Sequence, residues 1–524
     1  MRDFQTPGRS PVFASEGMCA TSHPRAALAA VDILRRGGNA MDAAIAGAVL
    51  LGICEPHMTG LGGDAFALWT RAGEDEVRAL NGSGRAPAAA TADALRARGL
   101  DAVPVDGAEA VTVPGAVAAF DHLATTEGRL GLGALLAPAI EAAEAGVPVA
   151  PRVAFDWTTA AARLSGAARD HFLVGGAAPA PGTLFRAPGQ AEVLRRIARD
   201  GARAFYEGEV AEDILATLAA RGGLHTAEDF AAAAPTPAQP ISGHYRGREL
   251  VEHPPNGQGA AAILLAQILE EFDLAALDPF GPERAHIEAE AWKLAEDARN
   301  RFVADPERAE AARLTDPGTA RRLAGLIRPD AVLPDVAPLT EAIHRDTVYI
   351  TVVDRDRMAV SLICSIFHGF GSGLASERFG ILLHNRGAGF TLTEGHPNEY
   401  GGGRRPMHTI IPAMLREGGR VTMPFGVMGG GYQPTGHARV LSNIADYGMD
   451  PQAALDAPRA FADAGALQLE RGYPEATRRA LADLGHRVVT PDQPLGGGQA
   501  IRIRDDGVLE GASDPRKDGC ALGY

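Results

Sequence analysis

The chain changes character within the stretch His344-Arg345-Asp346-Thr347-Val348-Tyr349-Ile350-Thr351-Val352-Val353-Asp354, where three polar residues end abruptly at Thr347. The β-branched and aromatic residues that follow the threonine predict a β-strand. The polar residues 354–357 then predict a turn, and the run from Met358 to Ile366 predicts a second strand. A hydroxyl side chain is therefore expected at the head of a buried strand.

Thr347 is the residue of this stretch that is suited to carry chemistry. A threonine hydroxyl is a poor nucleophile until a base removes its proton. If the chain cuts itself between Asp346 and Thr347, the new α-amine can serve as that base, because its unperturbed pKa of roughly 7.7–8.0 leaves a useful fraction neutral near pH 7. We therefore expect self-cleavage at this bond and a nucleophilic Thr347. The alternative is an ordinary threonine at the end of a strand.

The composition is that of a globular protein. The 524 residues are 46% hydrophobic and 22% charged, which allows a sizeable core. A net charge of −15 argues against a nucleic-acid partner, because phosphate binding needs clustered Lys and Arg. Four scattered cysteines make no disulfide framework. Residues 1–8 lack the apolar core of a secretory signal, and no apolar run is long enough to span a bilayer, so we expect a cytoplasmic protein without a membrane partner.

The two parts of the chain differ in their predicted structure. Before Thr347 the pattern is mostly helical, with helices expected at 22–38, 39–52, 257–272 and 283–302, and the polar segment 338–346 is expected to be an exposed linker. After Thr347, strands are expected at 348–354, 358–366, 380–384, 408–415, 420–427 and 499–504, with helices at 434–447 and 475–484. Helices outside and strands inside predict an α+β fold, a four-layer α/β/β/α sandwich.

Several stretches together resemble the gamma-glutamyltranspeptidase family, whose members are N-terminal-nucleophile hydrolases. In chain order the matching stretches are RGGNAMDAAIAGAVLLGICEPHMTGLGGDAF, VTVPGAVAAF, AFYEGEVAEDI, GGLHTAEDF, HYRGRELVEHPPNGQG, DTVYITVVDRDRMAVSL, FGSGLASERFGILLHNRG, FGVMGGGYQP and DPRKDG. Each is weak alone, but their order along nearly the whole chain is specific. The resemblance implies the layered fold, self-processing and amide chemistry.

The resemblance also implies roles for individual residues. The family pattern places the nucleophile on Thr347, with the cleaved bond between Asp346 and Thr347. Gly429 and Gly430 match the glycines whose backbone N–H groups form an oxyanion hole, and such donors contribute about 3 kcal/mol each. Ser365 falls where the family keeps a second hydroxyl, which could orient the nucleophile or relay its proton. The alternatives are a flexible glycine turn and simple strand packing.

The residues that would recognise a glutamyl head group are changed. The family's arginine for the α-carboxylate falls on Ser83, with Arg85 two residues further on. The positions that contact the α-amine fall on Phe367, Arg386 and Gly389, which cannot replace carboxylate and amide contacts to an ammonium group. The family's Ser-Ser pair becomes His408-Thr409, and the segment 390–406, where relatives often carry a longer lid, is short, which predicts a site more open to water.

These changes favour a substrate that carries a carboxylate but no α-amine. We expect the substrate-binding residues to be Arg85, Arg386, His408, Thr409 and Phe367, with the two arginines and the histidine as an anion clamp, because arginine suits bidentate carboxylate binding. The pattern is similar to the oxamate amidohydrolase branch of the family. The structural alternative is that the arginines are surface or ion-pair residues and that His408 is a core histidine.

The expected protein is a heterodimer made from one precursor, with a large subunit of residues 1–346 and a small subunit of residues 347–524 in one interlocked unit. A dimer of these heterodimers is left open as an alternative. No cofactor and no metal site are expected, since the histidines lack clustered spacing. Other enzyme functions left open are a gamma-glutamyltransferase or glutathione hydrolase and a glutaryl-type acylase. A non-enzyme alternative is an uncleaved relative that binds a small carboxylate.

Overall fold

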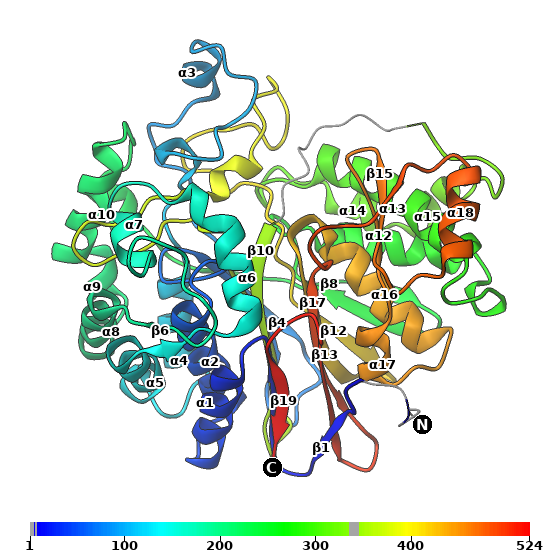
Figure 1. Cartoon of the computed structure of the whole chain (residues 1–524), viewed down its shortest axis with the longest axis horizontal. Helices are drawn as coiled ribbons and strands as arrows, with labels where there is room; N and C mark the ends of the chain where they lie inside the picture. Colours follow the sequence, from blue (N-terminus) through cyan, green and yellow to red (C-terminus); the bar gives the residue numbers. More distant parts are fainter. Residues whose placement is uncertain (1–4, 6–7, 335–344) are drawn as a thin grey trace.

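Two β-sheets lie face to face in the centre of the molecule, with a layer of helices on each outer side (Figure 1). The computed structural model describes residue 5, residues 8–334 and residues 345–524. The predicted linker at 338–346 therefore lies outside the described residues, apart from the backbone of its last two positions. The layering is the predicted four-layer α/β/β/α sandwich, and the predicted α+β fold class is confirmed.

Each central sheet has seven strands in the described part of the chain. The first sheet has the order β1 (Val12–Ala14), β18 (Leu509–Ser513), β17 (Gly497–Ile503), β13 (Arg420–Met428), β12 (Ala413–Glu417), β9 (Arg248–Glu252) and β8 (Ile241–Tyr245). The second has the order β19 (Cys520–Gly523), β2 (Met18–Thr21), β10 (Arg345–Val353), β11 (Ala359–His368), β3 (Asp64–Thr70), β4 (Arg78–Gly82) and β7 (Thr236–Ala238). Both sheets thus combine strands from before and after Thr347.

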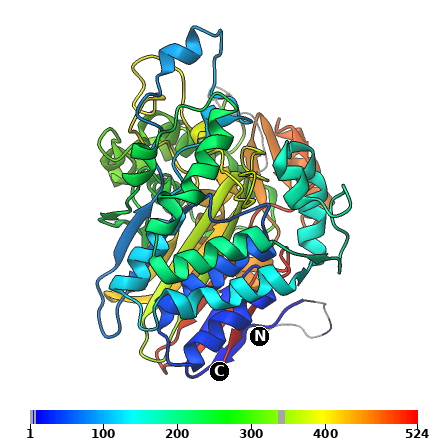
Figure 2. The ribbon, with the colours of Figure 1, turned by 90° about the vertical axis from the view of Figure 1, so that its left-hand side faces the viewer.

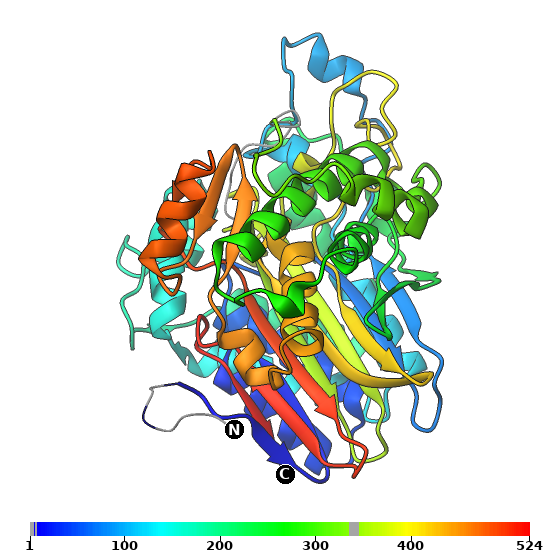
Figure 3. The same ribbon diagram turned by 90° about the vertical axis from the view of Figure 1, so that its right-hand side faces the viewer.

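The helical layers differ in origin. The layer over the second sheet comes from the first half of the chain (Figure 2) and contains α1 (Pro24–Arg35), α2 (Ala40–Cys54), α4 (Ala116–Thr126), α5 (Leu132–Ala145), α6 (Pro151–Ala160), α7 (Ala167–Phe172), α8 (Pro188–Asp200), α9 (Arg203–Tyr206), α10 (Glu209–Ala219) and α11 (Ala227–Ala231). The layer over the first sheet combines helices from before and after Thr347 (Figure 3) and contains α12 (Gly259–Glu270), α13 (Pro282–Phe302), α14 (Ala311–Thr315), α15 (Pro317–Ala324), α16 (Gln433–Ala445), α17 (Pro451–Asp456) and α18 (Glu475–Asp483). The short α3 (Ala92–Arg96) stands apart at the top of Figure 1.

Helix α2 fixes the position of the strand that begins beside Thr347. Its start is set by a capping box, in which Asn39 and Asp42 each bind the other's backbone N–H. Every residue of the helix is buried, as its continuous apolar sequence predicts. Gly47 lies directly against Ile350 of β10, where a Cβ atom on the glycine would overlap Ile350 Cδ1. Glycine therefore lets the helix approach the central strand closely.

Replacing Gly47 with alanine should destabilise the fold despite alanine's better helix propensity. The added methyl group meets Ile350, and overpacking of this kind costs roughly 1–3 kcal/mol. Chemical denaturation measures the effect as a lower unfolding midpoint. Gly133→Ala in α5 is the matched control, because the nearest atom to its added Cβ is 4.0 Å away; that variant should be neutral or more stable by up to about 1 kcal/mol. Equal midpoints for the two variants would contradict the close approach.

Tyr349 joins the two sheets. Its hydroxyl lies 2.6 Å from Ser361 Oγ on the neighbouring strand β11, and Ser361 Oγ in turn donates to the Phe425 carbonyl of the other sheet at 3.3 Å and accepts from Ala413 N–H at 3.1 Å. Gly426 leaves room for the tyrosine ring, which a Cβ atom there would overlap. These contacts hold β10 against the first sheet as well as in the second.

Two predicted strands differ in the structure. Segment 380–384 forms isolated bridges, Gly62 with Leu383 and Ala375 with Leu382, instead of a strand. The strand predicted at 408–415 begins at Ala413, because Pro412 has no N–H to donate to a ladder and the residues before it bond to the site described below. No helix in the described ranges has both the length and the apolar character that crossing a membrane requires.

Candidate active site

Thr347 lies at an irregularity in the pairing of β10 with β11. Asp346 pairs with Phe367 and Val348 with Cys364, so that three steps along β11 match two steps along β10. Such a bulge re-aims side chains and is common beside active sites. At this bulge the Thr347 hydroxyl donates a hydrogen bond to Ser365 Oγ, with 3.3 Å between the two oxygens. Thr347 is only 1% exposed, so the short segment 390–406 does not leave it open to water in this chain.

Ser365 is held by cationic and backbone donors on its other side. Its Oγ accepts from the backbone N–H of Phe367 at 2.8 Å and from Arg386 Nη2 at 3.1 Å. Phe367 has a φ of +80°, an uncommon conformation for a bulky residue that is often found at functional sites. The serine hydroxyl therefore connects the threonine to a buried guanidinium group.

Arg386 is fully buried, at the start of the short helix η4 (Arg386–Gly389). Its Nη1 donates to Thr409 Oγ1 at 3.0 Å, and its guanidinium carbon lies 4.1 Å from the centre of the Phe367 ring. A cation at this distance from a desolvated aromatic face is attracted by about 2 kcal/mol. Three predicted substrate-binding residues, Arg386, Thr409 and Phe367, are thus in direct contact beside Ser365.

Asp64, a buried carboxylate at the start of β3, balances the positive charge of Arg386. Its Oδ2 lies 3.0 Å from His408 Nε2, 3.3 Å from His384 Nδ1 and 3.9 Å from Arg386 Nε. Its Oδ1 accepts from the backbone N–H groups of Gly84 and Gly115. Burial alone would raise the pKa of Asp64, but the interaction with His384 and then the hydrogen bond from His408 outweigh burial and hold its pKa well below the usual range. Asp64 is therefore ionised.

His408 serves this carboxylate as a neutral donor. Its Nδ1 accepts from the backbone N–H of Ile410 at 3.3 Å, so its hydrogen is on Nε2 and points to Asp64. Burial, followed by the charge of Arg386, lowers the pKa of His408 to about 3. The imidazole is uncharged at neutral pH, and the structure assigns it to orienting Asp64 in place of supplying a positive charge to an anion clamp.

Gly429 and Gly430 form the turn between β13 and the short helix η5 (Gly430–Tyr432) that leads into α16. Both have positive φ angles, +121° and +57°, and a Cβ atom on Gly429 would lie 2.9 Å from Gly496 Cα. Glycine is therefore required for this backbone path. The turn contacts β10, and the N-terminus of α16 follows it, which favours negative charge at this point.

Gln258, at the beginning of α12, anchors the glycine turn to the arginine group. Its Nε2 donates to the Gly430 carbonyl at 2.8 Å and to the Thr409 carbonyl at 2.7 Å. Its Oε1 accepts from Arg299 Nη1 at 3.1 Å, which fixes the orientation of the amide. One buried side chain therefore sets the position of the turn relative to Thr409.

Replacing Gln258 with alanine should lower kcat about 10- to 100-fold. The change would displace the turn of Gly429 and Gly430, which the sequence predicts as oxyanion donors, and small displacements of such donors can cost about that much in rate. Steady-state kinetics on the cleaved enzyme measures the loss. Gln267→Ala in the same helix removes another buried glutamine, whose amide reaches the Thr315 carbonyl away from the turn, and should leave kcat nearly unchanged. Equal kcat losses in both variants would show a general effect of disturbing α12.

Arg85 does not join the other predicted clamp residues. Its side chain is 45% exposed, donates to the Gly403 carbonyl at 2.7 Å and lies 3.7 Å from Asp305. Ser83 is instead covered by Arg405, a buried arginine whose Nε donates to the Ser83 carbonyl at 2.9 Å. Burial, with the nearby charge of Arg85, lowers the pKa of Arg405 to about 10. The three-residue clamp is therefore not assembled: Arg386 and His408 share Asp64, whereas Arg85 faces solvent.

Sequence reasoning missed the parts of the site that no spacing pattern marks. Asp64 lies beside two histidines and an arginine that come from distant segments of the chain. His384, Gln258 and Arg405 were not singled out. His384 and Gln258 lie inside stretches that carry the family resemblance, which is the signal that could have directed attention to them.

Comparison with known proteins places the chain. The gamma-glutamyltranspeptidase family model matches residues 26–524. The glutathione hydrolase-like YwrD proenzyme of Bacillus subtilis (strain 168) is 36% identical, over 98% of this chain and 99% of the relative. The oxamate amidohydrolase proenzyme of Klebsiella pneumoniae is 33% identical, over 97% and 99%. The crystal structure of cephalosporin acylase from Bacillus halodurans superposes with a TM-score of 0.93 at 39% identity, over 100% and 99%. The predicted resemblance is confirmed: the chain belongs to the gamma-glutamyltranspeptidase family and is an N-terminal-nucleophile amide hydrolase.

Proposed function

We propose that the chain cuts its own Asp346–Thr347 bond and that Thr347 then hydrolyses a small amide that carries a carboxylate next to the reacting carbonyl, with oxamate as the leading substrate. The large subunit would be residues 1–346 and the small subunit residues 347–524. The proenzyme names of the relatives support self-processing, and the position of Thr347 on a bulged central strand supports its role as the nucleophile.

The proposed reaction uses groups of this chain alone. The freed α-amine of Thr347 takes the proton of Oγ1, and Oγ1 attacks the amide carbon. The backbone N–H groups of Gly429 and Gly430 stabilise the oxyanion. The amine then passes its proton to the leaving nitrogen, which departs as ammonia, and an ester to Thr347 remains. Water, deprotonated by the same amine, attacks the ester, releases the acid and restores Thr347.

The position of Arg386 is the observation that carries the substrate class. Two consecutive contacts, 3.3 Å from Thr347 to Ser365 and 3.1 Å from Ser365 to Arg386, put the guanidinium within about two hydrogen-bond lengths of the nucleophile. In oxamate the carboxylate is bonded directly to the attacked carbonyl carbon, so a cation this close can bind it. The terminal nitrogens of Arg386 donate to the neutral hydroxyls of Ser365 and Thr409, and a carboxylate would form stronger, charge-assisted hydrogen bonds.

An acylase that accepts longer acyl chains is the second candidate. The similarity to a cephalosporin acylase over the whole chain favours it. A glutaryl or gamma-glutamyl group, however, carries its carboxylate three carbons further from the reacting carbonyl, and the α-amine of the latter would be a cation in a site that already holds Arg386. Distance and charge thus favour the shortest substrate.

A series of ω-amides of increasing length tests the proposal: oxamate, malonamate, succinamate and glutaramate, with ammonia release as the readout and a gamma-glutamyl anilide as the comparison. We expect the highest kcat/KM for oxamate and a steady fall with chain length. A maximum at glutaramate would favour the acylase, and turnover of the anilide alone would favour glutathione hydrolase. Denaturing electrophoresis of the same preparation should show fragments of 346 residues and the remaining 178 of the 524; a single uncut chain would favour a binding protein.

A further inference from the structure

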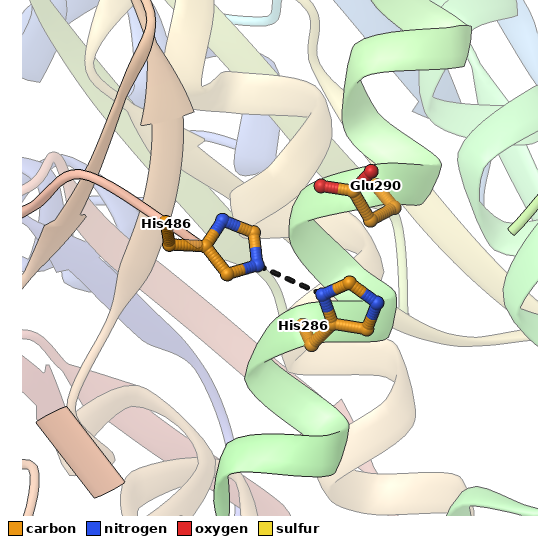
Figure 4. Close-up of side chains that lie close together, drawn as sticks. All are labelled: His286, Glu290 and His486. Atoms are coloured by element: carbon orange, nitrogen blue, oxygen red, sulfur yellow. Dashed lines mark hydrogen bonds between the residues drawn. The ribbon is translucent and has the colours of Figure 1, made fainter. Parts of the chain in front are cut away.

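Three potential metal ligands meet in the helical layer over the first sheet, away from the residues proposed to react. His286 and Glu290 lie four residues apart on α13 and so share one face of that helix. His486 follows α18 and comes from the other part of the chain (Figure 4). All three are buried, and one ligand atom of each lies within 4.8 Å of the others. The sequence predicts no metal site here because nearly two hundred residues separate the histidines.

His286 is oriented as a ligand by a backbone carbonyl. Its Nε2 lies 2.7 Å from the Arg328 carbonyl oxygen, and because a carbonyl only accepts, the hydrogen of a neutral ring is on Nε2. The lone pair on Nδ1 then faces His486 Nε2 at 2.8 Å. An imidazole with its outer nitrogen on a backbone carbonyl is the usual arrangement of metal-binding histidines, because it fixes the tautomer and the ring orientation.

Glu290 is oriented as well. One of its oxygens accepts from Leu333 N–H at 2.5 Å and the other from Lys293 Nζ at 2.8 Å. A carboxylate can accept about four hydrogen bonds or metal bonds in all. These two contacts therefore fix the orientation of the Glu290 carboxylate and leave lone pairs to bind a metal ion. The positive charge of Lys293 would repel a metal ion, but the ion pair of Lys293 with Glu290 offsets that repulsion.

We propose that His286 Nδ1, His486 Nε2 and a Glu290 oxygen bind one divalent transition-metal ion of the Zn²⁺ type. Two imidazoles and one carboxylate form a ligand set that Zn²⁺ accepts, with water as the fourth ligand. In a tetrahedral site, Zn–N bonds of about 2.0–2.1 Å put two nitrogens about 3.3 Å apart. His286 Nδ1 and His486 Nε2 lie 2.8 Å apart without the ion, so they would separate by about half an ångström. The His486 hydrogen then resides on Nδ1, and no proton is lost.

The ion would act as a structural tie. Its ligands come from residues 1–346 and from residues 347–524, so it would join the two products of self-cleavage, although its binding does not depend on the cut. Helix α13 also carries Arg299, which orients Gln258. His286 and Arg299 lie roughly 20 Å apart along this helix, at 1.5 Å per residue. The ion would therefore lie away from the end of α13 that contacts the active site.

Zinc titration of the full chain after chelator treatment tests the proposal. Isothermal titration calorimetry should show one Zn²⁺ per chain, and thermal denaturation should show a rise in Tm with zinc, because an ion that binds only the folded state stabilises it. Co²⁺ in place of Zn²⁺ should give the intense visible absorption of a four-coordinate site. His486→Gln should weaken binding more than the roughly 10- to 100-fold cost of losing an outer hydrogen-bond partner, and so should His286→Gln.

His244→Gln is the matched control, since His244 is exposed on β8 and its replacement should leave zinc affinity unchanged. Failure of the wild-type chain to take up zinc would overturn the proposal, as would affinity that survives both His286→Gln and His486→Gln. If a variant does not fold, the cobalt spectrum of the wild-type chain decides: a four-coordinate spectrum supports the site, and the spectrum of six-coordinate, hydrated Co²⁺ overturns it.

Discussion

Thr347→Ala should leave a single chain of 524 residues on denaturing electrophoresis and should abolish amide hydrolysis. The substitution removes the hydroxyl that attacks the Asp346 carbonyl and, after cleavage, the substrate, so both reactions lose their nucleophile. The lost rate should exceed about 1,000-fold, because no neighbouring group replaces a covalent nucleophile. The variant should remain folded, since alanine preserves the strand, and the loss of the buried hydrogen bond to Ser365 costs about 1 kcal/mol.

Thr347→Ser is the matched control for this experiment. It keeps the hydroxyl and loses only a methyl group, so cleavage and hydrolysis should persist at reduced rates. Thr351→Ala supplies a second control on the same strand, because the Thr351 hydroxyl donates to the Val360 carbonyl within the sheet and has no proposed part in the reaction. Cleavage of the Thr347→Ala chain at the same bond would disprove the assignment of the nucleophile.

Arg386→Gln should lower kcat/KM for oxamate about 100-fold or more. A charge-assisted hydrogen bond contributes about 1.5–3 kcal/mol, and a bidentate pair makes two of them. The comparison substrate is oxamide, in which a neutral amide replaces the carboxylate. The wild-type enzyme should strongly prefer oxamate, and the variant should lose most of that preference, because the substituted residue no longer supplies a positive charge.

Arg85→Gln is the control that separates the two predicted arginines. Arg85 is nearly half exposed and lies beside Gly403 and Asp305, and we expect its replacement to change kcat/KM by no more than about twofold. The unfolding midpoint of Arg386→Gln must be measured too, since breaking a buried ion pair costs about 3–5 kcal/mol and Asp64 would lose one of its three cationic or imidazole neighbours. A larger effect from Arg85→Gln than from Arg386→Gln would restore the exposed arginine as the carboxylate ligand.

The features that could be predicted from the sequence are those encoded by local patterns. The β-branched run after Thr347 indicates β10, and the apolar run from Asn39 indicates α2, because hydrophobic periodicity and caps depend on neighbouring residues. The glycines at 429 and 430 were identified through the family resemblance, and their positive φ angles explain why glycine occupies them. Pro412 shows the limit: its missing N–H delays the start of β12 to Ala413.

The charge balance of the site could not be predicted in this way. Arg386 and His408 were predicted to bind substrate, but their shared partner Asp64 lies more than three hundred residues earlier in the chain. One sequence gives no means to pair such residues. Arg85 was chosen because it is close in sequence to Ser83, yet two residues along an irregular loop can point to opposite sides, and the structure covers Ser83 with Arg405 instead.

The mixed origin of the two central sheets has a consequence for the timing of maturation. The bond proposed for cutting lies within β10, which pairs with β2 on one side and β11 on the other. Thr347 reaches its partner Ser365 only after β10 and β11 have paired, and the glycine turn arrives with the other sheet. Self-cleavage would therefore depend on completed folding. In a misassembled copy the nitrogen of Thr347 would stay in a peptide bond, so the enzyme would have no free α-amine and would not become active.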